Sequence, residues 1–221
     1  MRLICLSMII FTMLIWPAKA SECLAMAEGL ARVQPASLRV VAMAENEVSI
    51  SFVGHSTFRI ETAGGVVAAT DYNGNAGGST PDVVTMNRAH TTHYTNAPDP
   101  AIKHVLRGWG EDGAPAKHDL AVGDLRIRNV TTDIRFGAVN RVTDGNSIFI
   151  FEAAGLCIGH LGHLHHELTP GHIGWIGRLD VVMVPVDGRN TMPHANMMGV
   201  LKEIKAAVIL PMHIFGSSTL N

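Results

Sequence analysis

The feature that most constrains this chain is a series of short apolar runs, several of which end in a loop that carries histidines. Short runs rich in Val, Ile, Phe and Thr are typical of β-strands. On this basis the sequence predicts strands at 48–53, 57–62, 66–70, 82–86, 125–131, 146–153, 155–159, 180–186 and 206–210. The first two have a tight turn between them, and the turn at residues 154 and 155 makes 146–153 and 155–159 hairpin partners.

Three segments are predicted to be helical, at 100–108, 169–178 and 193–205. The chain therefore begins with strands and then alternates helix and strand. This order indicates an α/β layered architecture with a site at the ends of the strands.

The first 20 residues are typical of a secretory signal peptide. Arg2 precedes an apolar run at 3–16, and Pro17 and a small-x-small sequence at 18–20 follow it. The run is short for a bilayer core of about 30 Å, which needs roughly 20 helical residues. We therefore expect cleavage after Ala20, no membrane segment in the mature chain, and a periplasmic or secreted protein.

The composition of the 221 residues favours one globular domain, since 47% are hydrophobic and 16% are charged. We divide the chain into the signal peptide at 1–20, an Ala-rich lead-in segment at 21–46 and a domain at 47–221. The net charge of −2 comes without a block of basic residues, so the sequence lacks the basic footprint of a nucleic-acid-binding protein. Removal of the signal peptide leaves Cys23 and Cys157, and the sequence leaves open whether they form a disulfide.

The positions of the 12 histidines are more informative than their number. Histidines follow predicted strands in the segments 87–93, 160–166 and 210–213. Imidazoles that converge from separate strand ends can hold a zinc or other transition-metal ion. His55 lies in the first hairpin turn, and its position is intermediate between that of a metal ligand and that of a structural residue. The histidines outside these segments are predicted to be surface or capping residues: His104, His118, His172 and His194.

Residues 47–215 resemble the metallo-β-lactamase fold superfamily, in the branch that includes L-ascorbate 6-phosphate lactonase and related bacterial metal-dependent hydrolases. The opening hairpin of that branch reads Gly-His-Ser/Ala-x-Phe-x-Ile-Glu, which is similar to Gly54–Glu61 here. The other matching segments are Arg88–His93, His160–His163, Pro185–Gly188 and Pro211–His213. The resemblance implies an α/β fold of four layers, the αβ/βα sandwich.

The sequence departs from the metal-binding signature of that family. Arg88 and Thr92 replace the first His and the Asp of His-x-His-x-Asp-His, and His163 replaces the Asp of His-x-Gly-Asp. The family's His on the middle strand has no counterpart, and Asp133 is the nearest candidate. These departures favour one divalent ion instead of two.

The resemblance implies that His93, His163 and His213 hold this ion, for which zinc is the expected metal. Three imidazoles leave a position open for water, and zinc lowers the pKa of that water from about 15.7 to about 7. The expected activity is attack of metal-bound hydroxide on an ester, lactone, amide or phosphoester of a small-molecule substrate. For His90 two roles stay open, a fourth ligand or a general base.

Two further roles are left open by the residues. Arg88 either binds an anionic group of the substrate and assists catalysis, or pairs with Asp71 or Asp133. Asp71 either contacts a ligand histidine and fixes its orientation, or forms a turn. Asp133 is expected next to the metal ligands.

The alternative function is a non-catalytic metal- or anion-binding protein on the same fold, which the substitutions at Arg88, Thr92 and His163 favour. A weaker third hypothesis is metal buffering by the loop at 160–166. Family members continue past the last histidine, whereas eight residues follow His213 here. We therefore expect a second half that is truncated at the C-terminus, and the missing edge strand favours a homodimer.

Overall fold

The computed structural model describes residues 21–24, 44, 46–111, 114–136 and 140–214. The predicted signal peptide and most of the lead-in segment lie outside these residues, as does the chain after 214. No helix within the described ranges has the length and apolar character that a membrane crossing requires.

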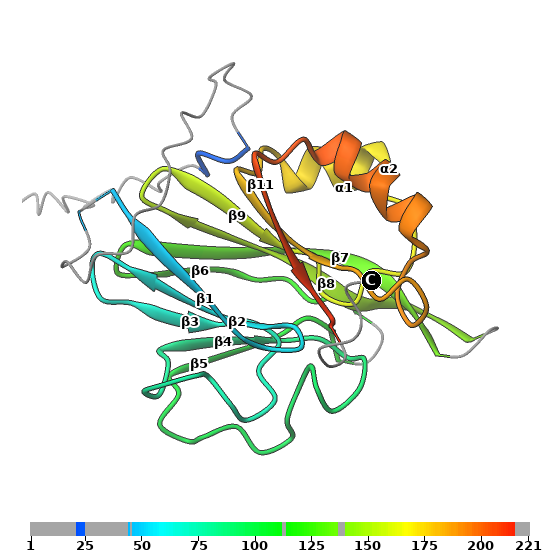
Figure 1. Ribbon diagram of the computed structural model, residues 1–221. Helices are drawn as coiled ribbons and strands as arrows, with labels where there is room; N and C mark the ends of the chain where they lie inside the picture. Colours follow the sequence, from blue (N-terminus) through cyan, green and yellow to red (C-terminus); the bar gives the residue numbers. More distant parts are fainter. Residues whose placement is uncertain (1–20, 25–43, 45, 112–113, 137–139, 215–221) are drawn as a thin grey trace, which may run out of the picture.

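The domain is built from two β-sheets and two helices (Figure 1). The first sheet has the order β1-β2-β3-β4-β5, with β1 Val48–Gly54, β2 Thr57–Thr62, β3 Val67–Ala69, β4 Val83–Met86 and β5 His104–Arg107. The second has the order β11-β10-β9-β8-β7-β6, with β6 Asp119–Val122, β7 Leu125–Phe136, β8 Asn140–Ala153, β9 Leu156–His160, β10 Val181–Pro185 and β11 Val208–Met212. The helices are α1 Pro170–Ile176 and α2 His194–Ile204.

Both predicted hairpins are present, and local turn chemistry explains them. Ala154 and Gly155 connect β8 to β9 with positive φ angles of 52° and 72°, the conformation that a two-residue hairpin turn requires. In the β1–β2 hairpin Ile50 pairs with Ile60, and a bulge precedes Gly54. The bulge and the turn place His55 at the end of the first sheet.

Three apolar clusters hold the layers together. The cluster between the two sheets contains Phe58, Ile60, Val83, Leu125, Ile127, Phe149, Phe151, Ile158 and Met183. A second cluster packs α1 and α2 against the outer face of the six-stranded sheet, through Ile176, Met197 and Val200. Each such side chain stabilises the fold by about 1.5–3 kcal/mol when it is fully buried.

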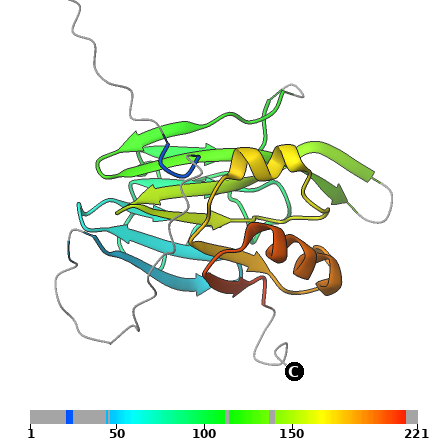
Figure 2. The same ribbon diagram turned by 90° about the horizontal axis from the view of Figure 1, so that it is seen from above.

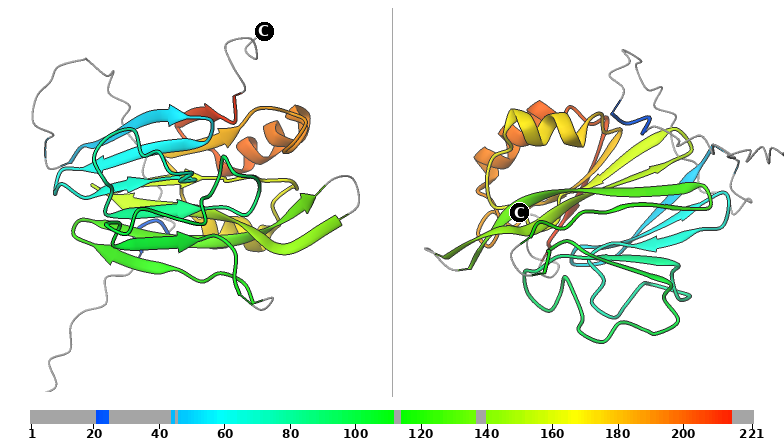
Figure 3. Two further views of the ribbon diagram at one scale, coloured as in Figure 1. Left: turned by 90° about the horizontal axis from the view of Figure 1, so that it is seen from below. Right: turned by 180° about the vertical axis from the view of Figure 1, so that it is seen from behind.

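The predicted sandwich is confirmed, with one difference in its outer layers. The helices cover the six-stranded sheet, as Figures 2 and 3 show. On the outer face of the five-stranded sheet, Tyr72, Ala76 and Ile102 pack against Val84 and Met86. In the part of the chain that the structure describes, loops therefore form this fourth layer.

Several of the secondary-structure predictions are wrong or incomplete. The strands predicted at 125–131 and 146–153 are parts of the longer β7 and β8. The segment predicted as a helix at 100–108 contains β5, which pairs in parallel with β4. Strand β6 was not predicted, and β11 lies two residues later than expected. Short apolar runs of this length do not separate strand from helix by their period alone, and pairing with β4 decides the structure of 104–107.

Cys23 and Cys157 form a disulfide, which answers the question that the sequence left open. Both cysteines are buried in the cluster beneath the helices. The backbone amide of Arg178 also donates to the carbonyl of Cys23 at 2.9 Å. The start of the lead-in segment is thereby attached to β9 and to the loop after α1.

Candidate metal centre

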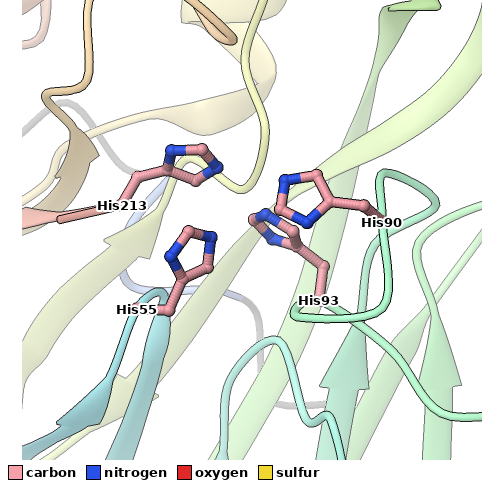
Figure 4. Close-up of side chains that lie close together, drawn as sticks. All are labelled: His55, His90, His93 and His213. Atoms are coloured by element: carbon pink, nitrogen blue, oxygen red, sulfur yellow. The ribbon is translucent and has the colours of Figure 1, made fainter. Parts of the chain in front are cut away.

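Four histidines converge at the ends of the strands. They are His55, His90, His93 and His213, and one ring nitrogen of each lies within 4.8 Å of the others (Figure 4). Strand β1 ends at the turn that carries His55, β4 ends before the loop with His90 and His93, and His213 follows β11. Segments far apart in the sequence thus supply one group, which we call the four-histidine group.

Within this group, His93 and His213 are buried, whereas His55 and His90 are partly exposed. The Nε2 atom of His93 has no hydrogen-bond partner among the described residues. A buried nitrogen without a partner is costly, and a metal ion would satisfy it. The donor set therefore fits zinc or another ion that prefers imidazole.

A buried carboxylate orients His93. The Oδ2 atom of Asp71 lies 2.5 Å from His93 Nδ1, and Asp71 Oδ1 accepts from Asn87 Nδ2 at 2.9 Å. Burial alone would raise the pKa of Asp71, but the interactions with His93, His160 and Asn87 outweigh burial and lower it. An ionised Asp71 holds the His93 proton on Nδ1, which leaves the Nε2 lone pair for a metal.

A second carboxylate stands behind His213. Asp187 Oδ1 lies 3.3 Å from His213 Nδ1, and the backbone amide of Asn190 donates to Asp187 Oδ2 at 2.5 Å. Burial works to raise the pKa of Asp187, but hydrogen bonds from His213, Thr191 and the loop backbone lower it well below its usual range. Sequence reasoning gave Asp187 no role, although it lies in the segment 185–188 that carries the family resemblance.

The two more exposed histidines are held in the neutral form. Burial, followed by the charges of neighbouring histidines, lowers the pKa of His55 to about 3 and that of His90 to about 4. His90 Nδ1 lies 2.7 Å from the Thr92 hydroxyl. Neutral imidazoles are the form that binds metals, so both can act as ligands near pH 7.

The backbone at the site has an unusual conformation. His55, Asp71 and His213 have positive φ angles of 51°, 40° and 63°. Non-glycine residues seldom adopt this region, and such strain is concentrated at functional sites. The His213 amide also donates to the His55 carbonyl at 2.6 Å, which ties the end of β11 to the first hairpin.

His163 lies beside the four-histidine group and is not one of its members. Its ring centroid is 4.9 Å from that of His93 and 4.8 Å from that of His213. Its Nδ1 atom makes a short hydrogen bond with His165 Nε2. Among the predicted ligands, the structure thus brings His90, His93 and His213 into one group with His55, and places His163 next to it.

The structure separates Arg88 from Asp133. Arg88 is exposed in the loop that carries His90 and His93. Asp133 accepts from the Arg141 guanidinium and from the amide of Asp144, and it is not a member of the four-histidine group. The β7–β8 hairpin thus supplies the partners of Asp133, and among the described residues neither carboxylate proposed for Arg88 pairs with it.

Sequence reasoning missed two residues that support the site. Asn87 is fully buried, donates to Asp71, and accepts from the backbone amide of Ser147 at 2.7 Å. Gly162 has a φ of 60°, and a Cβ there would lie 2.5 Å from Asn87 Nδ2 and 2.4 Å from Asn146 Oδ1. Only glycine fits this turn, which leads directly into His163.

His160 has a structural role. Its Nε2 atom lies 2.9 Å from the carbonyl oxygen of Ser56, and its Nδ1 atom accepts from the amide of Gly162 at 3.1 Å. Burial lowers the pKa of His160, which is consistent with a neutral ring. Both nitrogens are thus engaged by backbone groups.

Comparison with known proteins identifies relatives of this chain. A family model for the beta-lactamase superfamily domain matches residues 49–213. A metal-dependent hydrolase from Methanosphaerula palustris is 29% identical over an alignment of 149 residues, and the match covers 60% of this chain and 68% of that protein.

Solved structures show the same fold. The structure of a candidate zinc-dependent hydrolase of the metallo-beta-lactamase superfamily from Thermotoga maritima is 30% identical, with a TM-score of 0.58 over 78% of each chain. A metallo hydrolase from the archaeon Ignicoccus hospitalis is 20% identical, with a TM-score of 0.54, and the match covers 76% of this chain and 83% of that one.

Proposed function

The chain belongs to the metallo-beta-lactamase superfamily, and from this premise we propose that it is a hydrolase that works with one divalent ion, with zinc as the metal. The observation that carries the proposal is the four-histidine group with carboxylates behind two of its members. Carboxylate–histidine pairs of this kind fix the tautomer and orientation of metal ligands.

A single ion is favoured by the arrangement of the donors. His93 and His213 would hold the ion from the buried side, and His55 or His90 would be the third imidazole, which leaves a fourth position open for water on the side of solvent. This is the one such group of side chains found within the described residues.

The chemistry that zinc supplies when bound is to lower the pKa of water to about 7 and to polarise a substrate oxygen. Asp71 and Asp187 keep the Nδ1 protons of His93 and His213 in place, so that both Nε2 atoms point away from their carboxylates. Arg88 is exposed two residues before His90, and we assign it to an anionic group of the substrate. The substrate class is then a small ester, lactone, amide or phosphoester that carries a negative charge.

Hydrolysis of p-nitrophenyl acetate and bis(p-nitrophenyl) phosphate by residues 21–221 tests this function. We expect activity that a chelator removes, that zinc restores, and that His93→Ala abolishes. His118→Ala is the matched control. His118 contacts the Arg107 carbonyl and the Phe149 ring and is not part of the four-histidine group. Activity that persists in His93→Ala would contradict the proposal, and one bound zinc without hydrolysis of any ester would favour the non-catalytic alternative.

We also propose that the protein is exported. The Cys23–Cys157 disulfide supports this location, because disulfides persist in oxidising compartments such as the periplasm. The full chain expressed in a Gram-negative host should be recovered from the periplasm, shortened by its first 20 residues and without free thiols. A full-length chain with reduced cysteines in the cytoplasm would contradict export.

A further inference from the structure

A chain of hydrogen bonds leads from a guanidinium to the edge of the metal centre. Arg135 Nε donates to His165 Nδ1 at 3.2 Å, and Arg135 Nη2 donates to the carbonyl of Thr191 at 3.2 Å. A guanidinium has donors and no acceptor. His165 Nδ1 must therefore accept this hydrogen bond.

This direction fixes the protons on the next two rings. A neutral imidazole has one N–H and one acceptor nitrogen. Because His165 accepts at Nδ1, it carries its proton on Nε2 and donates to His163 Nδ1. His163 then accepts at Nδ1 and carries its own proton on Nε2. Because Nδ1 is an acceptor in both rings, neither ring carries a second proton in this arrangement.

The ring of His163 lies beside the four-histidine group, and the environment of its Nε2 atom decides what it can do. This atom is buried and has no hydrogen-bond partner among the described residues. The ring lies next to those of His93 and His213, and the His163 amide donates to Asn146 Oδ1 at 2.7 Å. His163 is therefore held through its backbone amide and through Nδ1 of its ring. Its Nε2–H group is left to donate to an acceptor that does not belong to the protein.

His163 and His93 are set to opposite tautomers by their partners. Asp71 accepts from His93, so the His93 lone pair is on Nε2 and suits a cation. His165 donates to His163, so a proton occupies the corresponding nitrogen. A protonated nitrogen cannot coordinate a metal, but it can stabilise negative charge on oxygen.

We propose that His163 is a hydrogen-bond donor to a substrate oxygen and not a metal ligand, with Arg135 and His165 as the residues that set its tautomer. This inference rests on the proposed function and deepens it. It assigns to His163 a catalytic role in which its Nε2–H stabilises the charge that develops on a carbonyl or phosphoryl oxygen. It replaces the ligand role that the family resemblance implies for this position.

Nitrogen-15 NMR of the histidine rings tests the tautomer directly. In the metal-free and the zinc-loaded wild-type protein we expect a protonated, pyrrole-type Nε2 and an acceptor, pyridine-type Nδ1 for His163, and the reverse for His93. A His163 proton on Nδ1, or a zinc-dependent shift at His163 Nε2, would overturn the proposal. The metal-free spectrum decides the tautomer even if the protein binds no zinc, in which case the proposed function fails separately.

Arg135→Met tests the origin of the tautomer. Without the guanidinium, His165 can carry its proton on either nitrogen, and we expect His163 to show a mixture of tautomers. Arg141→Met is the matched control, because Arg141 pairs with Arg135 across the same hairpin and bonds to Asp133 instead. An unchanged His163 spectrum in Arg135→Met would contradict the role of Arg135.

Substitution of His163 separates a donor from a ligand. His163→Gln retains an N–H group and His163→Leu removes it. We expect both variants to keep one zinc per chain, and inorganic phosphate, used as the anion probe, to bind His163→Leu about 10- to 100-fold more weakly than the wild type, with a smaller loss for His163→Gln. Loss of zinc from both variants, as expected for His93→Gln, would overturn the proposal, as would unchanged phosphate binding.

Discussion

Asp71 is the residue on which the orientation of His93 depends most directly. It is fully buried, and its two carboxylate oxygens are held by His93 and Asn87. The carbonyl oxygen of the same residue accepts from the Thr57 hydroxyl at 3.0 Å. Both the side chain and the backbone of Asp71 are therefore fixed.

Asp71→Asn should weaken zinc binding by about 10- to 100-fold, since loss of a carboxylate behind a ligand histidine has effects of this size. The amide keeps the size of the side chain but removes the charge that holds the His93 proton on Nδ1. Competition with a fluorescent chelator measures the affinity. Asp133→Asn is the control, because Asp133 lies outside the four-histidine group. Equal weakening in both variants would contradict this role for Asp71.

The stability of the metal-free protein should depend on pH through the neutral histidines. In the unfolded chain a histidine has a pKa near 6.5, whereas in the folded protein the pKa of His55 is about 3 and that of His90 about 4. Between about pH 4 and 6.5 the unfolded state binds more protons, so the free energy of unfolding should fall as the pH falls.

Urea unfolding of the metal-free protein at pH 7 and pH 5 measures this dependence. In the double variant His55→Gln, His90→Gln the loss of stability between these two pH values should be smaller. A pH dependence identical to that of the wild type would show that these two histidines do not cause it.

At the residue scale the sequence predicted part of the site. His90, His93 and His213 follow apolar strands, and this pattern was sufficient to predict that they lie close together. The role of His55 stayed open because a residue in a turn is not part of a periodic apolar pattern. Its positive φ angle was not predictable either, since in a sequence only glycine indicates that conformation. The pairing of Asp133 with Arg141 was not predicted, because it depends on the register of the β7–β8 hairpin and not on neighbouring residues.

At the scale of elements, the strand ends position the ligands and a buried arginine attaches a helix to the sheet. Arg128 on β7 donates to Glu152 on β8 at 2.7 Å and to the carbonyls of Trp175 and Ile176, the last two residues of α1. At the other end, Thr169 and His172 form a capping box. The prediction that His172 is a surface or capping histidine is thereby confirmed.

Arg128→Met should destabilise the protein by about 3–5 kcal/mol, because it leaves the largely buried carboxylate of Glu152 without its charged partner and two helix carbonyls without their donor. Arg126→Met is the matched control, since Arg126 lies two residues earlier and pairs with the exposed Asp119. For this surface pair we expect about 0–1 kcal/mol. Chemical denaturation measures both values, and similar losses for the two variants would contradict the buried role of Arg128.

The sequence predicted elements well where the signal is local. The hairpin turns at Gly54 and at Ala154-Gly155, and the start of α1 at Pro170, all depend on neighbouring residues. The strand at 104–107 depends on pairing with β4, and β6 depends on pairing with β7. Such long-range partners leave little trace in a segment of four residues.

At the scale of the whole molecule, the sandwich encloses an apolar core and the disulfide attaches Cys23 to β9. Cys23 and Cys157 are 134 residues apart in sequence. Cross-links of this kind reduce the entropy of the unfolded chain. The order of the predicted elements indicated an α/β layered architecture, whereas the four-layer sandwich was predicted from the family resemblance.

Replacement of both Cys23 and Cys157 by Ala should lower the free energy of unfolding by about 2–5 kcal/mol. Thermal unfolding of the oxidised wild type, the reduced wild type and the double variant measures the effect. A reductant should lower the stability of the wild type and leave the double variant unchanged. Equal stability of oxidised and reduced wild type would contradict a stabilising disulfide.

The most direct test of the account is the metal content of residues 21–221, purified without an affinity tag, measured by elemental analysis. We predict one zinc ion per chain in the wild type, and loss of the ion in His93→Ala and in His213→Ala, with circular dichroism showing that both variants keep the fold. A well-folded wild-type protein that retains no divalent ion after dialysis against zinc would contradict this prediction.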